Sequence, residues 1–372
     1  MAINTLMRDC IVVGGGLMGL LTARALNQAG VKVMLLERGE IGRESSWAGG
    51  GIVSPLIPWE YPDAVSALVS WSQRHYPVLA SELRDETGVD IEWVQCGLLM
   101  VEFKPDRSVE AWAERHHCRL QFLDEVRTKA LEPALVDGFR TAILLPDVGQ
   151  VRNPRLCKAL RRSLRLNGVT IFQHTPVTEI ISQDGVVRGA RTPAGAHYAD
   201  SVVIAAGAWS AQLLRGTGLV LPISPVRGQM IQYQCAPGLL KHIVLHRNHY
   251  LIPRTDGLIL VGSTVEHTGF DKSTTREARE ELTRAATELV PALSDYELVR
   301  QWAGLRPESP EGVPFIGEHP GLEGLFVIAG HFRNGVVTGP ASVRVLLGRM
   351  GILPELADPA PYAVDKYVEP AP

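Results

Sequence analysis

The chain has 372 residues, of which 45% are apolar and 21% are charged. This composition excludes a disordered, fibrous or miniature protein and predicts a globular protein with room for two intertwined domains. Lys and Arg number 37 and Asp and Glu number 40, which gives a net charge of -3. Without an excess of positive charge, we expect neither nucleic acid nor an anionic membrane as a partner.

The cysteine and histidine residues show no pattern typical of a metal site. The five cysteines are scattered, with no Cys-x-x-Cys pair, and we expect reduced thiols. His242, His246 and His249 lie close together in the sequence, but their segment lacks the acidic or thiol residues of a first-row metal site. We therefore expect structural or surface roles for them and no bound metal.

No segment has the pattern of a secretory signal or a membrane span. The apolar run before the first glycines is too short for a signal peptide, and no later segment approaches the ~18 apolar residues of a transmembrane helix. We therefore expect a cytoplasmic protein.

The first predicted elements form a strand, helix and strand over residues 9–37. The strand CIVV precedes a glycine turn, in which Gly14 permits the tight bend, Gly16 lets N–H groups approach a pyrophosphate, and Gly19 lets the helix pack closely on the strand. The second strand ends at Glu37, whose carboxylate can accept hydrogen bonds from ribose hydroxyls. This unit predicts an adenine dinucleotide site, although Glu37 is also compatible with a solvated acid at a strand end.

Two later stretches favour FAD over a nicotinamide cofactor, which the glycine turn alone does not distinguish. The segment ESSWAGGG at 44–51 offers hydroxyls and bare backbone to a phosphate and to an isoalloxazine ring, with a flexible loop as the alternative. The segment VVIAAGAWS at 202–210 predicts a buried strand whose small terminal residues, Ala206 and Gly207, leave room for a cofactor.

These motifs, together with WAGLRP (302–307), PFIG (314–317) and GHFRNGVVTGP (330–340), resemble the D-amino-acid oxidase superfamily of flavoproteins. The sequence is most similar to the glycine oxidase branch, the type associated with thiazole synthesis for thiamine. The resemblance covers about residues 9–350, and GHFRNG is its most specific element.

The resemblance and the strand patterns imply an α/β fold in which a Rossmann-like FAD-binding domain is interleaved with an α+β substrate domain built on an antiparallel sheet. We expect the substrate pocket between the two domains. The FAD-binding domain would comprise 1–60, 147–220 and 303–372, and the substrate domain 61–146 and 221–302.

Matching motifs imply a set of flavin contacts. The C-terminal glycine turn would direct the first amides of the following helix at the negative charge of a reduced flavin. We expect the FAD to be non-covalent, because ESPEGVPFIG lacks the cysteine of the sarcosine oxidase branch and Trp47 replaces the histidine of another branch. A core position is the alternative for Val177. The contact residues are Gly14, Gly16, Gly19, Glu37, Arg38, Ser45, Ser46, Gly50, Gly51, Val177, Ala206, Gly207, Trp209, Gly335, Val336 and Val337.

Hydride transfer from an amino acid to flavin N5 requires the protein to hold the carboxylate, aim the C–H bond and exclude water. The resemblance implies that Arg306 binds the carboxylate, for which a planar guanidinium suits better than lysine. It implies that the Tyr250 hydroxyl assists and that Arg333 lies near the pocket mouth. The alternatives are a structural ion pair for Arg306, a core position for Tyr250 and a loop salt bridge for Arg333.

The resulting prediction is oxidative deamination of glycine or another small amino acid or amine (sarcosine, D-alanine, D-proline). The products would be a 2-oxo acid, ammonia or an amine, and hydrogen peroxide from oxygen. The alternative is a D-amino-acid dehydrogenase that passes electrons to a quinone. A pyridine-nucleotide reductase would need a second strand-linked glycine motif, which the sequence lacks after Gly19, and a non-catalytic FAD scaffold would be indifferent to loss of Arg306. Relatives suggest a homo-oligomer, with a tetramer expected.

Overall fold

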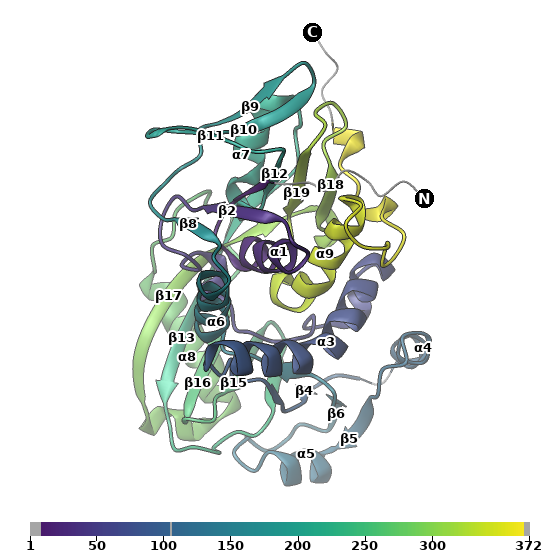
Figure 1. Ribbon diagram of the computed structural model, residues 1–372. Helices are drawn as coiled ribbons and strands as arrows, with labels where there is room; N and C mark the ends of the chain where they lie inside the picture. The colour runs from purple at the N-terminus through teal and green to yellow at the C-terminus, as the bar shows by residue number, and fades with distance from the viewer. Residues whose placement is uncertain (1–8, 105, 368–372) are drawn as a thin grey trace.

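The computed structural model describes residues 9–104 and 106–367. The outer ends of the predicted FAD-binding domain, 1–8 and 368–372, lie outside the described residues. Figure 1 shows two large sheets, one in the upper and one in the lower part of the molecule, with helices α1, α9, α6 and α3 between them.

The upper sheet has six strands in the order β18-β19-β12-β1-β2-β8, and all neighbouring pairs are parallel except the antiparallel pair of β18 with β19. The order reverses at β1, which is where parallel sheets of this kind bind nucleotides at the carboxyl ends of the strands. The predicted α/β class with a Rossmann-like sheet is thereby confirmed. The strands are β1 (Asp9–Val13), β2 (Lys32–Leu36), β8 (Thr170–Phe172), β12 (Ser201–Ile204), β18 (Phe315–Glu318) and β19 (Leu325–Ala329).

Both faces of this sheet are covered, and residues 10–13 of its strand β1 are apolar and buried. Cys10 and Val12 of β1 pack into the core under the helices, whereas Ile11 and Val13 pack toward a small three-stranded sheet. This alternation is the two-residue period of a strand buried on both faces. The covering helices are α1 (Leu17–Gln28), α3 (Asp63–Thr87), α6 (Asn153–Leu166) and α9 (Gly335–Arg349), and the small sheet comprises β9 (Glu179–Gln183), β10 (Val186–Thr192) and β11 (Gly195–Tyr198).

The lower sheet has eight strands in the order β17-β13-β16-β15-β14-β4-β6-β5. Every neighbouring pair is antiparallel except β14 with β4. Helix α8 (Arg276–Leu289) packs on one face of it through Leu282, Ala286 and Leu289. The strands are β4 (Leu98–Val101), β5 (Gln121–Asp124), β6 (Thr141–Leu145), β13 (Ser224–Gln234), β14 (Ile243–His246), β15 (His249–Pro253), β16 (Leu258–Gly262) and β17 (Glu297–Glu308).

The remaining elements are short and lie outside the three larger sheets. The strands β3 and β7 form a two-stranded antiparallel sheet. These elements are α2 (Ser45–Ala48), α4 (Arg107–Arg115), α5 (Glu125–Leu131), α7 (Ser210–Leu214), β3 (Val94–Gln95) and β7 (Gly149–Gln150), with 3-10 turns at Pro58–Glu60, Gly207–Trp209, Arg215–Thr217, Pro291–Asp295, Pro310–Gly312, Ala360–Tyr362 and Asp365–Tyr367.

The packing of α3 differs from what the predicted domain boundaries imply. The predicted boundaries place 61–146 in the substrate domain, but Leu68, Tyr76 and Leu83 of α3 share one core with the helices under the six-stranded sheet. The hydroxyl of Tyr76 also donates a 2.6 Å hydrogen bond to the carbonyl of Val336 at the start of α9. The apolar face of α3 is therefore buried against helices formed by distant parts of the chain. The residue-level domain boundaries stay a prediction.

The histidines of the lower sheet have acidic partners that come from distant parts of the sequence. His242 lies 2.7 Å from Glu132, His246 lies 2.7 Å from Glu102, and His249 lies 3.0 Å from Glu281. Each histidine thus has a different acidic partner. The residues that the structure describes contain no group of His, Cys, Asp and Glu able to hold a metal ion. In the same residues, no helix is both long and apolar enough to cross a membrane.

Replacing Gly19 with alanine tests the packing of α1 on β1. A Cβ at position 19 would overlap the carbonyl oxygen of Gly14, so the helix must move although alanine itself favours helix. We expect the free energy of unfolding, measured by urea titration, to fall by about 1–3 kcal/mol. Gly216→Ala is the matched control, because its Cβ would meet nothing within 4 Å. Equal stability of the two variants would contradict this account of Gly19.

Candidate active site

A cavity of about 400 Å³ is lined by residues from both large sheets. Gly14 and Gly16 contribute from the turn after β1, and Tyr250 and Arg306 contribute from β15 and β17. The cavity therefore connects the turn predicted to bind a dinucleotide with the arginine predicted to bind a carboxylate.

The glycine turn brings bare backbone against the cavity. Gly14 has φ of +109°, and a Cβ there would overlap the carbonyl oxygen of Ala205 on the neighbouring segment. Gly16 is the N-cap of α1 and provides no side-chain cap, so the helix begins with N–H groups that need partners from outside the helix. One of them is satisfied: the N–H of Leu17 donates to the hydroxyl of Ser46 over 2.8 Å.

Glu37 is buried at the end of β2, with 8% of its surface exposed, which excludes the alternative of a solvated acid. Its two carboxylate oxygens accept hydrogen bonds from the N–H groups of Gly15 (2.6 Å) and Gly39 (2.7 Å). Each carboxylate oxygen has a further lone pair, so Glu37 can hold the turn and still accept a hydroxyl. Glu37 is also one of the residues that line the cavity.

The segment Ser45–Gly51 is pinned in place and is not a flexible loop. Trp302 donates to the carbonyl of Ala48 (2.9 Å), Asn153 donates to that of Gly49 (3.0 Å), and Arg254 donates to that of Gly50 (2.8 Å). Arg254 is itself buried, and burial, together with the positive charge of Arg152, lowers its pKa to about 10. Arg254 is a supporting residue that the motifs did not reveal, because its partners lie far away in the sequence.

Arg38 and Trp209 contact each other on the lining of the cavity. The Arg38 guanidinium lies 3.4 Å above the centre of the Trp209 ring and forms a 3.0 Å ion pair with Glu44. Phe270 also packs against Trp209, and the centres of the two rings are 5.3 Å apart. A guanidinium stacked on an aromatic ring is a favourable arrangement, and it borders the cavity.

Arg306 and Tyr250 approach the cavity across the two strands that lie between their own, β13 and β16. A Cβ at Gly228 on β13 would overlap the Arg306 guanidinium. A Cβ at Gly262 on β16 would come within 2.8 Å of the Tyr250 ring and hydroxyl. Each long side chain therefore lies over a glycine of the neighbouring strand, and both line the cavity.

The surroundings of Arg306 are polar, and within the residues that the structure describes no acid forms a hydrogen bond with it. It donates to the carbonyl of Thr264 (3.0 Å) and to the hydroxyl of Ser263 (2.7 Å). Burial lowers the pKa of Arg306, an effect that Tyr250 and Glu266 oppose and that the positive charge of Arg333 increases. A guanidinium has five N–H donors, so Arg306 keeps donors for a carboxylate.

The turn before α9 contributes an exposed cation and two buried polar groups. Arg333 is exposed and forms no hydrogen bond or ion pair within residues 9–104 and 106–367. His331 and Asn334 are each 3% exposed, and their Nε2 and Nδ2 atoms have no hydrogen-bond partner in the described part of the chain. Burial lowers the pKa of His331 to about 3, so its imidazole is neutral at pH 7.

Most of the predicted site residues come together on this cavity. The exceptions are Gly19 and Val337, which are absent from the lining: Gly19 packs against Gly14, and Val337 belongs to the core beneath α9. The lining residues that the motifs did not indicate include Gly228, Met230, His331 and Asn334. His331 and Asn334 lie within the recognised GHFRNG segment, which was the available signal for them.

These residues fit FAD. The bare turn at Gly14 and Gly16 and the N-terminus of α1 suit a pyrophosphate. The side chain of Asn334 does not cap α9, so the first N–H groups of this helix can face a negatively charged group. The unpartnered Nε2 of His331 and Nδ2 of Asn334 line the same cavity and need partners that the described protein does not supply.

Known proteins similar to this chain are flavoenzymes. Residues 9–347 match the family described as "DAO: FAD dependent oxidoreductase". The chain is 49% identical over 354 residues to the glycine oxidase of Pseudomonas aeruginosa, covering 95% of this chain and 97% of that protein. It is 47% identical over 357 residues to the glycine oxidase of Pseudomonas putida, covering 96% and 98%. The crystal structure of glycine oxidase from Geobacillus kaustophilus is similar with a TM-score of 0.87 at 30% identity, over 98% of this chain and 100% of that one.

Replacing Gly228 with alanine tests how Arg306 is placed. The new Cβ would overlap the guanidinium and displace it by about 1 Å, which can lower activity roughly 100-fold when a binding group is misplaced. We expect kcat/KM for an amino-acid substrate to fall by that order while FAD content stays unchanged. Gly317→Ala in β18 is the strand control, because nothing lies within 4 Å of its Cβ position. Unchanged kcat/KM in Gly228→Ala would show that Arg306 does not need this bare backbone.

Proposed function

Because the chain belongs to the DAO family of FAD-dependent oxidoreductases, we propose that it oxidises glycine and other small amino acids or amines. The family confirms the resemblance predicted from the motifs, and the chain is an FAD-dependent amino-acid oxidase. The observation that supports this substrate class is Arg306 on the lining of the cavity, a guanidinium that forms no hydrogen bond with an acid among the described residues.

The dinucleotide would be held by the residues that line the cavity between β1 and α9. Gly14, Gly16 and Ser46 would hold the pyrophosphate, Glu37 the ribose hydroxyls, and the first amides of α9 the flavin edge that becomes negative on reduction. Bound FAD supplies a hydride acceptor at N5 of its isoalloxazine ring. Other cofactor contacts are proposed for Arg38, Ser45, Gly50, Gly51, Val177, Ala206, Gly207 and Trp209.

Arg306 would bind the substrate carboxylate, with the Tyr250 hydroxyl as a second donor and Arg333 as a second positive charge. These three side chains fix one end of the substrate, so its α-carbon is directed into the cavity. Two nearby guanidinium groups also disfavour an ammonium ion, which lowers the pKa of a bound amine and favours the neutral form. The described residues therefore need to supply no strong base.

The lining contains acidic side chains, but they are engaged elsewhere. Glu37 accepts from the N–H groups of Gly15 and Gly39, and Glu44 pairs with Arg38 and Lys272. Within the described residues, neither acid forms a hydrogen bond with Arg306 or Tyr250. We infer that the amine loses its proton to solvent and that the protein acts by orienting the substrate and excluding water.

We further propose oxygen as the electron acceptor, so that the products are a 2-oxo acid, ammonia or an amine, and hydrogen peroxide. A dehydrogenase that uses a quinone is the other outcome of the test below. A cytoplasmic homo-oligomer, with four copies, is also proposed, and light scattering of the holoenzyme tests its size.

Anaerobic mixing with glycine, sarcosine or D-alanine tests the reaction. We expect the flavin absorption to bleach, and in air we expect peroxide in a ratio of one to each substrate consumed. Arg306→Ala should weaken transition-state binding by roughly 2–5 kcal/mol, because one partner of a charge pair is lost. Arg306→Lys should recover only part of it, since lysine cannot bind a carboxylate bidentately.

The control is Arg276→Ala, which removes an exposed arginine of α8 whose partner is Glu280. Bleaching by none of the small amino acids would contradict the proposed substrate class. Bleaching without peroxide in air would identify a dehydrogenase.

Acid precipitation tests the attachment of the flavin. No cysteine occurs among the lining residues of the cavity, so we expect the yellow colour to stay in the supernatant when the holoenzyme is denatured with acid. Flavin absorption in the washed pellet would show a covalent link and overturn this expectation.

A further inference from the structure

We propose that the ion pair between Arg227 and Glu266 positions Arg306 by holding the segment against which its guanidinium rests. Neither member of the pair lines the cavity, so both would act through Arg306 and not on the substrate. The inference rests on the carboxylate-binding role of Arg306 proposed above.

The guanidinium of Arg306 is held from one side by two consecutive residues. Its Nη1 donates to the carbonyl of Thr264 over 3.0 Å and its Nη2 to the hydroxyl of Ser263 over 2.7 Å. Both acceptors directly follow the last residue of β16, Gly262. The direction of the guanidinium therefore depends on where this segment leaves the sheet.

The segment after β16 contains one residue more than the part of β13 that it faces, which makes a β-bulge. The ladder pairs Met230 with Gly262, and an isolated bridge then pairs Arg227 with Glu266. Two residues lie between Arg227 and Met230 on β13, whereas three residues lie between Gly262 and Glu266 on the facing segment. Such a bulge turns side chains out of the regular strand pattern, which is how Ser263 and the carbonyl of Thr264 can both face Arg306.

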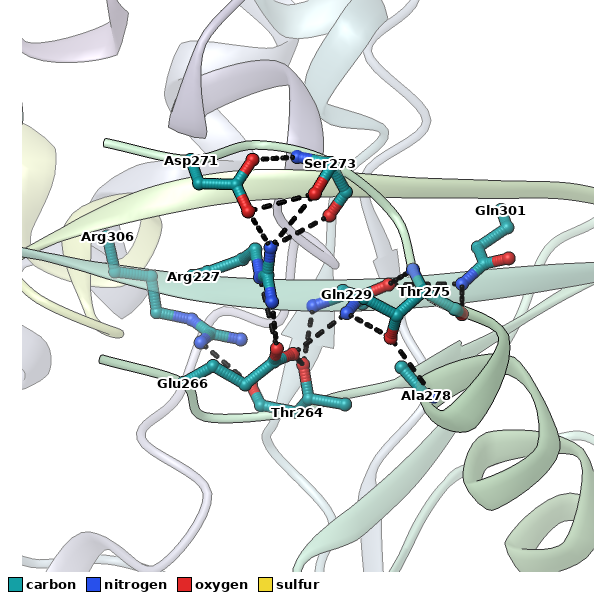
Figure 2. Close-up of polar contacts among 10 residues, drawn as sticks. All are labelled: Arg227, Gln229, Thr264, Glu266, Asp271, Ser273, Thr275, Ala278, Gln301 and Arg306. Atoms are coloured by element: carbon teal, nitrogen blue, oxygen red, sulfur yellow. Dashed lines mark hydrogen bonds and ion pairs between the residues drawn. The ribbon is translucent and has the colours of Figure 1, made fainter. Parts of the chain in front are cut away.

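The carboxylate of Glu266 fixes this bulge to β13, as Figure 2 shows. Its Oε2 accepts from Nε of Arg227 (3.0 Å) and also from Nη2 of the same guanidinium. Its Oε1 accepts from the Gln229 amide (2.9 Å) and from the hydroxyl of Thr264. Since Thr264 supplies the carbonyl that holds Arg306, one carboxylate connects β13 with the acceptor of the guanidinium.

All three guanidinium nitrogens of Arg227 donate hydrogen bonds to the segment after β16. It is 5% exposed, and its remaining terminal nitrogen, Nη1, donates to Asp271 and to Ser273 further along the segment. A buried guanidinium with every nitrogen bonded has little freedom to move. It therefore provides a fixed point for the carboxylate of Glu266.

Charge supports the same assignment. Burial alone would raise the pKa of Glu266, but hydrogen bonds from Thr264, Arg227 and Gln229 lower it overall, so the group is an anion at neutral pH. That anion opposes the loss of positive charge on Arg306, which burial and Arg333 favour. Glu266 thus affects both the place and the charge of Arg306.

The same hydrogen bonds also support the start of α8, and the test must distinguish this stabilising role from the positioning of Arg306. Gln229 bonds to Thr275, whose hydroxyl caps α8 by accepting from the N–H of Ala278 over 3.3 Å. A variant that only loosened α8 would lower stability without a specific effect on Arg306. The measurement must therefore report on binding through Arg306.

The test is the affinity of the holoenzyme for acetate, a carboxylate without an amine, measured from the change in flavin absorption. We expect Glu266→Gln to raise the Kd of acetate about tenfold, since charge-assisted hydrogen bonds are replaced by neutral ones. Thr264→Val, which removes the hydroxyl between Glu266 and Gln229 but keeps the carbonyl, should raise it less. Glu280→Gln, in the exposed pair of α8 with Arg276, is the matched control and should leave it unchanged.

A double-mutant cycle with Arg306→Ala separates positioning from a general structural effect. If the pair acts through Arg306, adding Glu266→Gln to Arg306→Ala should change the Kd of acetate less than about twofold. An equal loss in both backgrounds would overturn the inference. So would a Kd within about twofold of the wild-type value in both Glu266→Gln and Thr264→Val while Arg306→Ala raises it.

The same data distinguish failure of the proposed carboxylate role of Arg306 from failure of the positioning role of the ion pair. If Arg306→Ala itself leaves the Kd of acetate unchanged, the carboxylate role of Arg306 is wrong and the positioning role falls with it. If Glu266→Gln yields no folded holoenzyme, Thr264→Val, which removes no charge, decides the question by the same measurement.

Discussion

Both ends of the cavity depend on backbone that has no Cβ. At the dinucleotide end, Gly14 lies against the carbonyl of Ala205, and Gly19 brings α1 against that turn. At the other end, the Arg306 guanidinium lies over Gly228, and the Tyr250 ring lies over Gly262. Because a methyl group at any of these positions would overlap a neighbouring group or press against it, glycine determines how closely the helix, the turn and the two polar side chains can approach the cavity.

Arginine has two different roles around this cavity, and its partners decide which. Arg227 and Arg254 are buried. The nitrogens of Arg227 donate to acids and to Ser273, and the two terminal nitrogens of Arg254 donate to carbonyls and to Gln150. They stabilise the segments beside the cavity. Arg306 keeps free donors, and Arg333 has no partner within the described residues. A carboxylate ligand would therefore meet the two cations whose charge no acid neutralises by direct contact.

The segment that follows β16 connects the two ends of the cavity. Ser263 and Thr264 hold Arg306, whereas Phe270 packs against Trp209 and Lys272 pairs with Glu44, which also pairs with Arg38. The segment thus contacts both the proposed carboxylate site and residues proposed to lie near the dinucleotide. The segment follows a strand of the eight-stranded sheet, and its side chains contact residues that follow β2 and β12 of the six-stranded sheet.

The sequence by itself determined the βαβ unit, the FAD family and a part of the cavity lining. The glycine turn, Glu37 and the GHFRNG segment could be predicted because they form their local structure from residues that are close in the chain. Only the tertiary structure decided that α3 shares a core with α9, that Glu37 is buried, and that Arg254 holds the Gly50 carbonyl. It also decided that Gly228 lies beneath Arg306 and that Glu266 connects β13 to the Arg306 acceptor. These contacts join residues far apart in the sequence, so strand register and packing, and not local pattern, determine which side chains meet.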